Sequence, residues 1–498
     1  MNLTLSLGIS NNGGTTRKRK LWDGVDDVGD GGSGGDRGRV IMRLLQAREE
    51  RMTARLETDD DPSRAAACSD NTDDDAGGGI RLMRLLLSSA AASEAGDARA
   101  AAAALREVYR RASFGGGDPA QRVAAYFADA LASSSRILIL SPAAAAPPPP
   151  TSERRFLAYT MFYQASPMYQ LAHFTANQAI VEAFEAGARR RRLHVVDFDV
   201  AYGFQWPSLI QSLSDAAAAT TSTSGSGSSS DGSCDEPVSL RITGLGTSAD
   251  ELRRTEARLT RFASGCPNLR FEFEGIVVDN GASRDGIINI KTDDDETVVV
   301  NLVFPDARNS SSREECGTLL ARVRSLNPAL VFLVEKHDGS GNATSTITSS
   351  LLLPRFTASL RYFAAVFDSL HECLPADSAE RLAIERNHLG AEISSAVASL
   401  LHEQHRHDDD DGHTANTWKE MMESAGFEGV KLSSRTVSQA RLLLKMKSGC
   451  CGGGGFRVVE EDAGKAMSLG WRDSTALITA TAWRRRSTSW AATHKFID

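Results

Sequence analysis

The amino-acid sequence predicts an α/β protein in which an all-helical cap precedes a doubly wound mixed sheet. Apolar residues recur at helical spacing throughout residues 80–187. From residue 193 onward, short apolar runs alternate with helical stretches, a pattern typical of parallel strands joined by right-handed crossovers. The last expected strands include two that flank a glycine run at 452–455, which suggests a hairpin. A sheet that is parallel early and antiparallel late has a methyltransferase-like, Rossmann-type topology.

Composition excludes several classes of protein. The chain has 498 residues and a net charge of −8, which argues against indiscriminate nucleic-acid binding but leaves a local basic patch open. Seven cysteines are scattered without a C-x-x-C spacing, which indicates free thiols in a reducing compartment and no zinc module. We interpret the His-containing acidic run at Asp408–Asp411 as solvated loop, not as a metal site. No apolar run approaches the ~20 residues of a membrane span, and we expect an intracellular protein.

Residues 1–79 are interpreted as a disordered regulatory segment, because much of this stretch is rich in glycine and aspartate. Within it, Leu3, Leu5 and Leu7 alternate with polar residues. An extended peptide of this kind places its leucines on one face, where they can fill the pockets of a partner. The spacing resembles the L-x-L-x-L repression motif of plant regulators; the alternative is a chance alternation.

A compact basic run follows in the same segment, formed by Arg17, Lys18, Arg19 and Lys20. It is similar to a nuclear import signal, which works by placing cations in an acidic groove of the import receptor. The alternative is a solvated charge cluster. We expect the protein to be nuclear.

The predicted helical cap spans residues 80–187. Gly96-Asp97 interrupts its first apolar-periodic stretch and divides it into two helices. Asp118 and Pro119 have the residue types of an N-cap and a first helical position, so a third helix is expected to begin there. Two more helices follow a proline-rich loop.

The α/β core is predicted over residues 188–486, with a tail at 487–498. Strands are expected at 193–198, 239–244, 270–278, 297–304 and 329–335, and later at 430–432, 440–447, 456–460 and 476–483. Helices are expected at 206–214, 249–263, 314–326, 355–373, 378–403 and 417–425.

Asp197 and Asp199 end the first predicted strand. In open α/β sheets, ligands bind in the crevice past the carboxyl ends of the strands. The two carboxylates therefore have two interpretations. They line a small-ligand pocket, or they are structural groups that accept backbone N–H bonds or pair with Arg241 or His194, because an unpaired buried charge is costly.

The turn after this strand lacks the features of an S-adenosylmethionine site. Such a site needs a glycine-rich turn after the first strand and a carboxylate at the end of the second. Here Gly203 is the only glycine in the turn, bulky Phe204 and Trp206 follow it, and the second strand ends at 242–246 without an acid. We therefore predict no catalytic residues and no cofactor, and we expect the turn to be packed shut.

The order of the sequence blocks resembles the GRAS family of plant transcriptional regulators, in its scarecrow-like group. The resemblance covers residues 80–486, with a first leucine-rich region at 80–187 and a second at 251–263. The core block, usually spelled VHIID, stands here as Leu193-His194-Val195-Val196-Asp197 and continues through Asp199, Gly203, Gln205, Trp206 and Pro207. The PFYRE block corresponds to Pro328, Tyr362, Phe363, Arg381 and Glu385, and the SAW block to Trp471, Ala482 and Trp483.

This resemblance implies a nuclear regulator of transcription that acts through protein–protein interactions, as a repressor or cofactor of DNA-binding transcription factors. The implied partners are other transcription factors, a corepressor of the TOPLESS type, and GRAS proteins in homo- or heterodimers. Two alternatives remain open. One is a transcription factor that binds specific DNA sequences directly, and the other is a degenerate methyltransferase-like domain that retains a small-molecule ligand.

Arginine clusters flank the predicted core and are candidates for contact with phosphates. They comprise Arg189, Arg190, Arg191 and Arg192 before the first strand, Arg484, Arg485 and Arg486 after the last, and Arg253, Arg254 and Arg258 on one helix. The alternative is solvated surface charge. A phosphate-binding patch requires that clusters from distant parts of the chain meet in space.

Overall fold

A computed structural model describes most of the chain. The described residues are 76–134, 150–187, 191–223, 237–278, 290–304, 313–338, 352–375, 377–404, 417–450, 455–472 and 475–486. The leucines of the L-x-L-x-L motif (Leu3, Leu5, Leu7), the basic run Arg17–Lys20, and Arg189 and Arg190 lie outside these residues.

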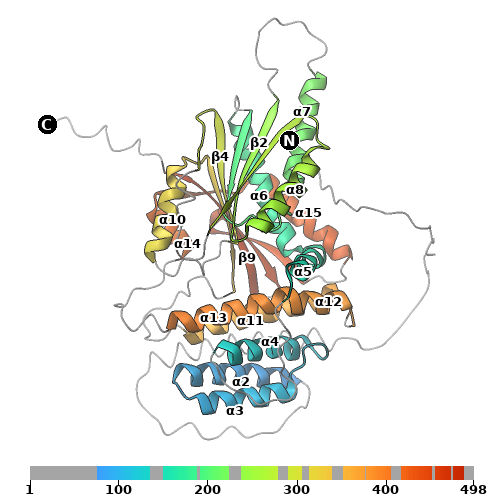
Figure 1. The fold of residues 1–498 in the computed structure, drawn as a ribbon, viewed down its shortest axis with the longest axis vertical. Coiled ribbons are helices and arrows are strands. Elements are labelled where there is room, and N and C mark those ends of the chain that lie inside the picture. Colours follow the sequence, from blue (N-terminus) through green and yellow to red (C-terminus); the bar gives the residue numbers. More distant parts are fainter. Residues whose placement is uncertain are drawn as a thin grey trace, which may run out of the picture.

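A nine-stranded mixed sheet forms the centre of the fold (Figure 1). Its strand order is β3-β2-β1-β4-β5-β9-β8-β7, and β6 pairs with β9. The first five strands in sequence are parallel, and β6 to β9 pair antiparallel, as the sequence predicts. The strands are β1 (Arg192–Asp197), β2 (Val238–Gly246), β3 (Leu269–Val277), β4 (Glu296–Val303), β5 (Leu330–Lys336), β6 (Phe427–Val430), β7 (Phe456–Glu461), β8 (Ala466–Trp471) and β9 (Thr475–Arg485).

The centre of the sheet is buried on both faces. Every residue of β4 is buried, as are Leu193–Asp197 of β1. Near-continuous apolar runs of this kind are typical of parallel strands covered by helices on both sides. Because β2 lies on one side of β1 and β4 on the other, the strand order reverses at β1, and this is the position where α/β sheets bind ligands.

A helical layer lies at one end of the sheet (Figure 1) and combines two distant parts of the chain. The N-terminal part contributes α2 (Ala76–Glu94), α3 (Ala98–Arg111) and α4 (Pro119–Ser134). The second half contributes α11 (Leu352–Cys373), α12 (Ala379–Ile384), the π-helical turn η3 (Glu385–Leu389) and α13 (Gly390–Gln404). Of these, α11 and α13 pack against α4, α11 also packs against α2, and α12 and η3 pack against α5 (Ser152–Ala165).

The predicted helix boundaries in this layer are confirmed by their caps. Asp97, at the break after Gly96, accepts a hydrogen bond from the backbone N–H of Ala100 at 2.9 Å. The Asp118 carboxylate accepts one from the N–H of Gln121 at 2.8 Å, and α4 begins at the next residue. Each cap satisfies a donor that the first helical turn leaves free.

Helices connect and cover the sheet. They are α5 (Ser152–Ala165), α6 (Pro167–Ala186), α7 (Trp206–Thr223), α8 (Ala249–Ala263), α10 (Arg313–Ser325), α14 (Trp418–Ser424) and α15 (Ser434–Cys450). The helix α6 is buried without a break from Pro167 to Val181, and it packs against β4, β5 and β9. A helix that is apolar or buried all round lies inside a core, so α6 joins the cap to the sheet.

One predicted strand is wrong, and another strand was missed. Residues 440–447, expected as a strand, lie in α15. Four residues at helical spacing, Val437, Ala440, Leu443 and Leu444, are buried there, so the short leucine run is one face of a helix. The strand β8 was not predicted, and β6 ends at Val430, where we expected a strand to begin.

Among the described residues, no helix is both long enough and apolar enough to span a bilayer.

Candidate functional site

Asp197 is a buried structural carboxylate at the end of β1. One oxygen accepts a hydrogen bond from the Trp206 indole N–H at 3.1 Å, and the other accepts bonds from the Asn301 amide at 3.0 Å and from the backbone N–H of Asp199 at 3.4 Å. Burial raises the pKa of Asp197 to about 7, although the Asn301 bond opposes that rise. The structural interpretation is therefore favoured, but the partners are neither Arg241 nor His194. Asp199, in contrast, is exposed and accepts a bond from the N–H of Ala201 at 3.3 Å.

The turn that follows β1 is held by an amide network. The Gln205 side chain donates to the Asn177 oxygen of α6 at 3.1 Å and to the Asn301 oxygen of β4 at 3.2 Å. Gly203 has φ +69°, and a Cβ there would lie 2.7 Å from the Thr255 side chain, so this position requires glycine. Pro207 is the second residue of α7, where its missing N–H is tolerated.

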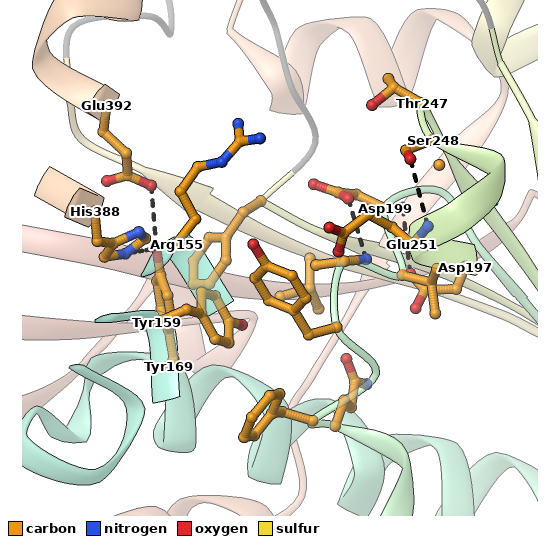
Figure 2. A pocket seen from close by; sticks show the side chains of 18 of the residues that line it. Arg155, Tyr159, Tyr169, Asp197, Asp199, Thr247, Ser248, Glu251, His388 and Glu392 are labelled. Atoms are coloured by element: carbon orange, nitrogen blue, oxygen red, sulfur yellow. Dashed lines mark hydrogen bonds between the residues drawn. The ribbon is translucent and has the colours of Figure 1, made fainter. Parts of the chain in front are cut away.

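The crevice beyond Asp197 is open, and our expectation that it is packed shut is wrong. A cavity of about 710 Å³ lies past the carboxyl ends of β1, β2, β4 and β5 (Figure 2). The Trp206 indole does not fill it, because it is fully buried and bonded to Asp197. The Phe204 ring lies against Tyr159 and Tyr163, at centroid distances of 5.4 and 5.2 Å, and forms part of the wall.

Acidic and hydroxyl groups form one side of this pocket (Figure 2). The second strand ends at Gly246 without an acid, as predicted, but α8 begins three residues later and brings Asp250 and Glu251 to the wall. Ser248 caps α8 by accepting a bond from the Glu251 N–H at 3.4 Å. Asp199 also lines this side.

A hydrogen-bonded cluster forms the opposite side (Figure 2). The Lys336 ammonium donates to Glu392 at 2.8 Å and to the Tyr169 hydroxyl at 3.2 Å. Burial opposes the charged form of Lys336, but Glu392 outweighs it and raises the pKa of the ammonium. The His388 ring lies 3.2 Å from the same hydroxyl, and burial lowers its pKa, so it is neutral at physiological pH.

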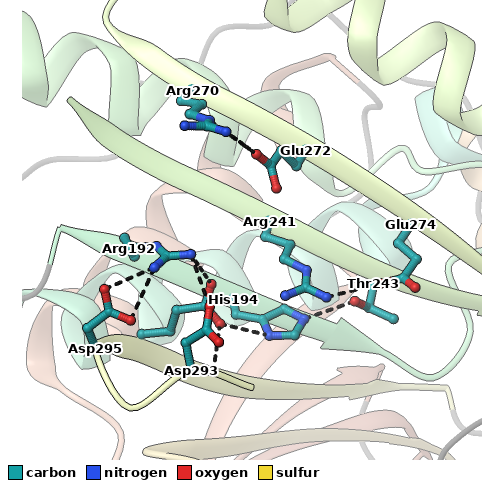
Figure 3. Close-up of polar contacts among 10 residues, drawn as sticks. Arg192, His194, Arg241, Thr243, Arg270, Glu272, Glu274, Asp293 and Asp295 are labelled. Carbon is teal, nitrogen blue, oxygen red and sulfur yellow. Dashed lines mark hydrogen bonds and ion pairs between the residues drawn. The ribbon is translucent and has the colours of Figure 1, made fainter. Parts of the chain in front are cut away.

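His194 belongs to a separate polar cluster on the sheet (Figure 3). Its Nε2 lies 2.9 Å from the Thr243 hydroxyl, and its Nδ1 lies 3.3 Å from the Glu296 carboxylate. Burial and the nearby Arg241 lower the pKa of His194 to about 4, so the ring is neutral at pH 7. It does not line the pocket.

The described arginines of the candidate phosphate-binding clusters are mostly engaged by other groups. Arg192 donates to Asp293, Asp295 and Glu296 at 2.9–3.2 Å (Figure 3). Arg484 pairs with Glu428 at 2.6 Å. Arg485 donates to the Asn327 side chain, and Arg253 donates to Asp250. The Arg486 backbone N–H donates to the Gly426 carbonyl, a bond that does not involve its guanidinium group.

These clusters do not form one patch. Arg192 begins β1, and Arg484 is the last but one residue of the antiparallel strand β9, so these two clusters lie at the same end of the strands with β4 and β5 between them. Arg253 and Arg254 lie near the start of α8, at the opposite end of the strands, and Arg254 lines the pocket. The side-chain Nε of Arg191 is buried and has no hydrogen-bond partner within the described part of the chain.

Residues of the PFYRE block hold the helical layer together. Glu385, fully buried, accepts bonds from Arg122 at 3.0 and 3.2 Å and from Arg381 at 2.9 Å. Arg122 is on α4, so the contact joins segments 263 residues apart in sequence. Resemblance assigned Arg381 and Glu385 to the PFYRE block, but nothing in the sequence identified Arg122 as their partner.

The other block residues are core positions. Tyr362 and Phe363 are buried on α11, and Pro328 is buried just before β5. The Trp471 indole donates to Asp368 at 2.7 Å, and the Trp483 indole donates to the Thr481 hydroxyl at 2.9 Å. Ala482 is buried on β9 opposite Phe332.

Several pocket residues had no sequence signal. Tyr159, Tyr169, Lys336, His388 and Glu392 come from α5, α6, β5, η3 and α13. Each looks like an ordinary residue of its own element, because its function in the wall depends on neighbours far away in sequence.

Comparisons with known proteins agree with the fold. The GRAS domain family model matches residues 82–484. The chain is 33% identical over 332 residues to the DELLA protein GAIP of Cucurbita maxima, covering 65% of this chain and 50% of that protein. It is 31% identical over 333 residues to Scarecrow-like protein 18 of Arabidopsis thaliana, covering 66% of this chain and 67% of that protein. The matches span about half the length of the DELLA relatives.

A crystal structure of SCL7 in Oryza sativa superposes with a TM-score of 0.58 at 29% identity, covering 81% of this chain and 99% of that one. The predicted methyltransferase-like α/β fold is thereby confirmed. With the family model matching over most of its length, this chain belongs to the GRAS domain family.

Proposed function

We propose that this protein is a nuclear transcriptional regulator of the GRAS type that acts through protein partners. The GRAS match over residues 82–484 carries this proposal, because it covers nearly all of the described chain. In this proposal the folded domain binds DNA-binding transcription factors or another GRAS protein. Leu3, Leu5 and Leu7 recruit a corepressor of the TOPLESS type, so the outcome is repression.

The state of the arginines favours protein partners over direct DNA binding. A phosphate at Arg192 would have to displace three carboxylates, and one at Arg484 would have to displace Glu428. Counterion release strengthens DNA binding only when cations are free to neutralise phosphates. Arg253 and Arg254 also lie at the opposite end of the strands from Arg192 and Arg484, so the three clusters together offer no continuous track for a duplex.

Repression is tested with the full chain tethered to a reporter promoter. Replacing Leu3, Leu5 and Leu7 by Ala removes the side chains that fill the partner's pockets, and we expect repression to be lost. The matched control replaces the intervening Thr4 and Ser6 by Ala, which changes the same peptide but keeps its leucine face. Equal repression by the leucine variant and the control would rule out recruitment through this motif.

Nuclear import is tested with a fluorescent fusion. Replacing Arg17, Lys18, Arg19 and Lys20 by Ala should move the fusion to the cytoplasm, because the import receptor needs a compact cationic run. Replacing the isolated Arg37 and Arg39 instead should leave it nuclear. If the variant that lacks all four basic residues remains in the nucleus, another segment of the chain directs import.

Direct DNA binding, the competing function, makes a different prediction. It requires that affinity fall steeply with salt and that Arg192→Ala weaken binding across all sequences. At low salt, we expect no sequence-specific binding of the purified protein to DNA, that is, no bound DNA that a specific competitor displaces better than a non-specific one. Competable, sequence-specific binding by the purified protein would replace our proposal with this alternative.

A further inference from the structure

The pocket beyond β1 has the size and place of a ligand site. Its volume of about 710 Å³ lies within the ~300–1,000 Å³ of small-molecule sites. It opens where the strand order reverses at β1, with Asp197 on one strand and Val303 on the next lining it. Most of the surrounding wall comes from packed helices and strand ends, so the cavity is pre-formed.

The charges on the wall are predominantly negative. Seven lining residues are Asp or Glu and three are Lys or Arg: Asp197, Asp199, Asp250, Glu251, Glu335, Asp338 and Glu392 against Arg155, Arg254 and Lys336. Lys336 pairs with Glu392 at 2.8 Å, and Arg155 and Arg254 are exposed residues of the wall, as Asp199 and Asp250 are. Carboxylates therefore outnumber cationic side chains on the wall, although Asp250 and Glu392 each have an ion-pair partner.

Two carboxylates are placed to meet a cation. Asp199, in the turn after β1, and Glu251, in the first turn of α8, lie near each other on the wall (Figure 2). Glu335 lies on the wall at the end of β5, and burial, the only cause, raises its pKa to about 7. Within the described ranges of the chain, no Lys or Arg forms an ion pair with Glu335, and a positively charged ligand would relieve the cost of burying this carboxylate.

The rest of the wall suits a flat, partly apolar body. Tyr159, Tyr169 and Phe204 present aromatic surface, and aromatic faces attract organic cations. His173, on the same wall, is 8% exposed, and its Nδ1 has no hydrogen-bond partner among the described residues. Because that nitrogen is itself buried, a ligand in the cavity does not reach it, and the aromatic faces are the part of this wall that can bind a ligand.

We propose that this pocket binds a small organic cation of about nucleoside size, with its charge held by Asp199, Glu251 and Glu335 and its body against the aromatic wall. This inference is separate from the proposed regulatory function, because it needs neither a partner protein nor DNA. The proposal concerns ligand binding alone and includes no transfer of a methyl group.

The test compares matched charged and uncharged probes by thermal shift of the full chain. S-adenosylmethionine carries a sulfonium that S-adenosylhomocysteine lacks, and 1-methyladenosine carries a ring cation that adenosine lacks. We expect the charged member of at least one pair, at millimolar concentration, to raise Tm while its uncharged counterpart does not. Equal shifts within both pairs, or no shift from any of the four, would overturn the proposal.

Variants locate the binding. Glu251→Gln and Glu335→Gln keep the size of the side chain. Each should lower the affinity for the probe that raised Tm by at least tenfold. Glu272→Gln is the matched control, because Glu272 pairs with Arg270 on the exposed strand β3, away from the pocket. Glu335→Gln also removes an unfavourable buried charge, so it should fold at least as well as the unchanged protein. Undiminished binding by both pocket variants would place the cation elsewhere and overturn the assignment.

Discussion

Replacing Glu385 by Gln tests how the helical layer is held together. The Glu385 carboxylate is fully buried and is the shared acceptor of Arg122 and Arg381, whose side chains are 0% and 2% exposed. The Gln variant leaves two buried guanidinium groups without a counter-charge. Removing one partner of a buried ion pair costs about 3–5 kcal/mol of stability, and here both cations lose theirs, so we expect the upper part of that range.

The pKa directions predict what happens when the whole cluster is replaced. Burial raises the pKa of Glu385 and lowers that of Arg122, even though each group attracts the other. Desolvation therefore exceeds the Coulombic gain, and the cluster itself adds little net stability. Arg122→Met, Arg381→Met and Glu385→Leu together should recover most of the stability that Glu385→Gln loses.

Urea denaturation followed by far-UV circular dichroism measures both effects. Glu385→Gln should lower the urea midpoint by roughly 1 M. Glu460→Gln is the matched control, since Glu460 pairs with Arg441 at 2.7 Å on the surface, and such pairs contribute about 0–1 kcal/mol.

Two results would refute this reasoning. If Glu385→Gln is as mild as Glu460→Gln, the cluster is not a desolvated ion pair. If the triple variant is no more stable than Glu385→Gln, the arginine bonds to the backbone matter more than the charges. Those bonds run from Arg122 to the Gly117 carbonyl at 2.7 Å and from Arg381 to the Gly115 carbonyl at 3.4 Å.

Three further predictions concern the sheet and the pocket. Folding raises the pKa of Glu335 to about 7, so the free energy of unfolding falls as pH rises from about 4.5 to 7. Glu335→Gln should abolish that fall. Measured by chemical denaturation, the variant should be more stable than the unchanged protein by up to about 3 kcal/mol at pH 8 and equally stable at pH 4. His194 behaves oppositely. Its folded pKa of about 4 lies below the unfolded value of ~6.5, so stability is lost as pH falls between them, by up to about 3 kcal/mol, and His194→Gln should flatten this acid limb. Trp206→Phe keeps the aromatic core but removes the 3.1 Å bond to Asp197, and should cost about 1–3 kcal/mol. An unchanged denaturation midpoint would show that the Asn301 amide and the Asp199 N–H satisfy this carboxylate without the indole.

The order of the elements could be predicted because each strand and helix carries its own periodicity. The five parallel strands, and the caps at Asp97 and Asp118, lie where the sequence places them. The error at 440–447 has a local cause, since three consecutive leucines obscure the spacing of the buried positions in α15. Short apolar runs cannot be assigned to helix or strand by periodicity alone.

The candidate site was predictable only in part. The sequence alone determined that Asp197 and Asp199 end a buried strand and that a turn with Gly203 follows, because these features are local. Only the tertiary structure decided that the crevice is open. That outcome depends on the orientation of the Trp206 side chain. Its indole N–H donates to Asp197, and the ring does not line the cavity. Composition could not reveal the acidic, aromatic character of the cavity, because its wall is assembled from residues between Ser152 and Trp418 that meet only when cap helices and strand ends pack together.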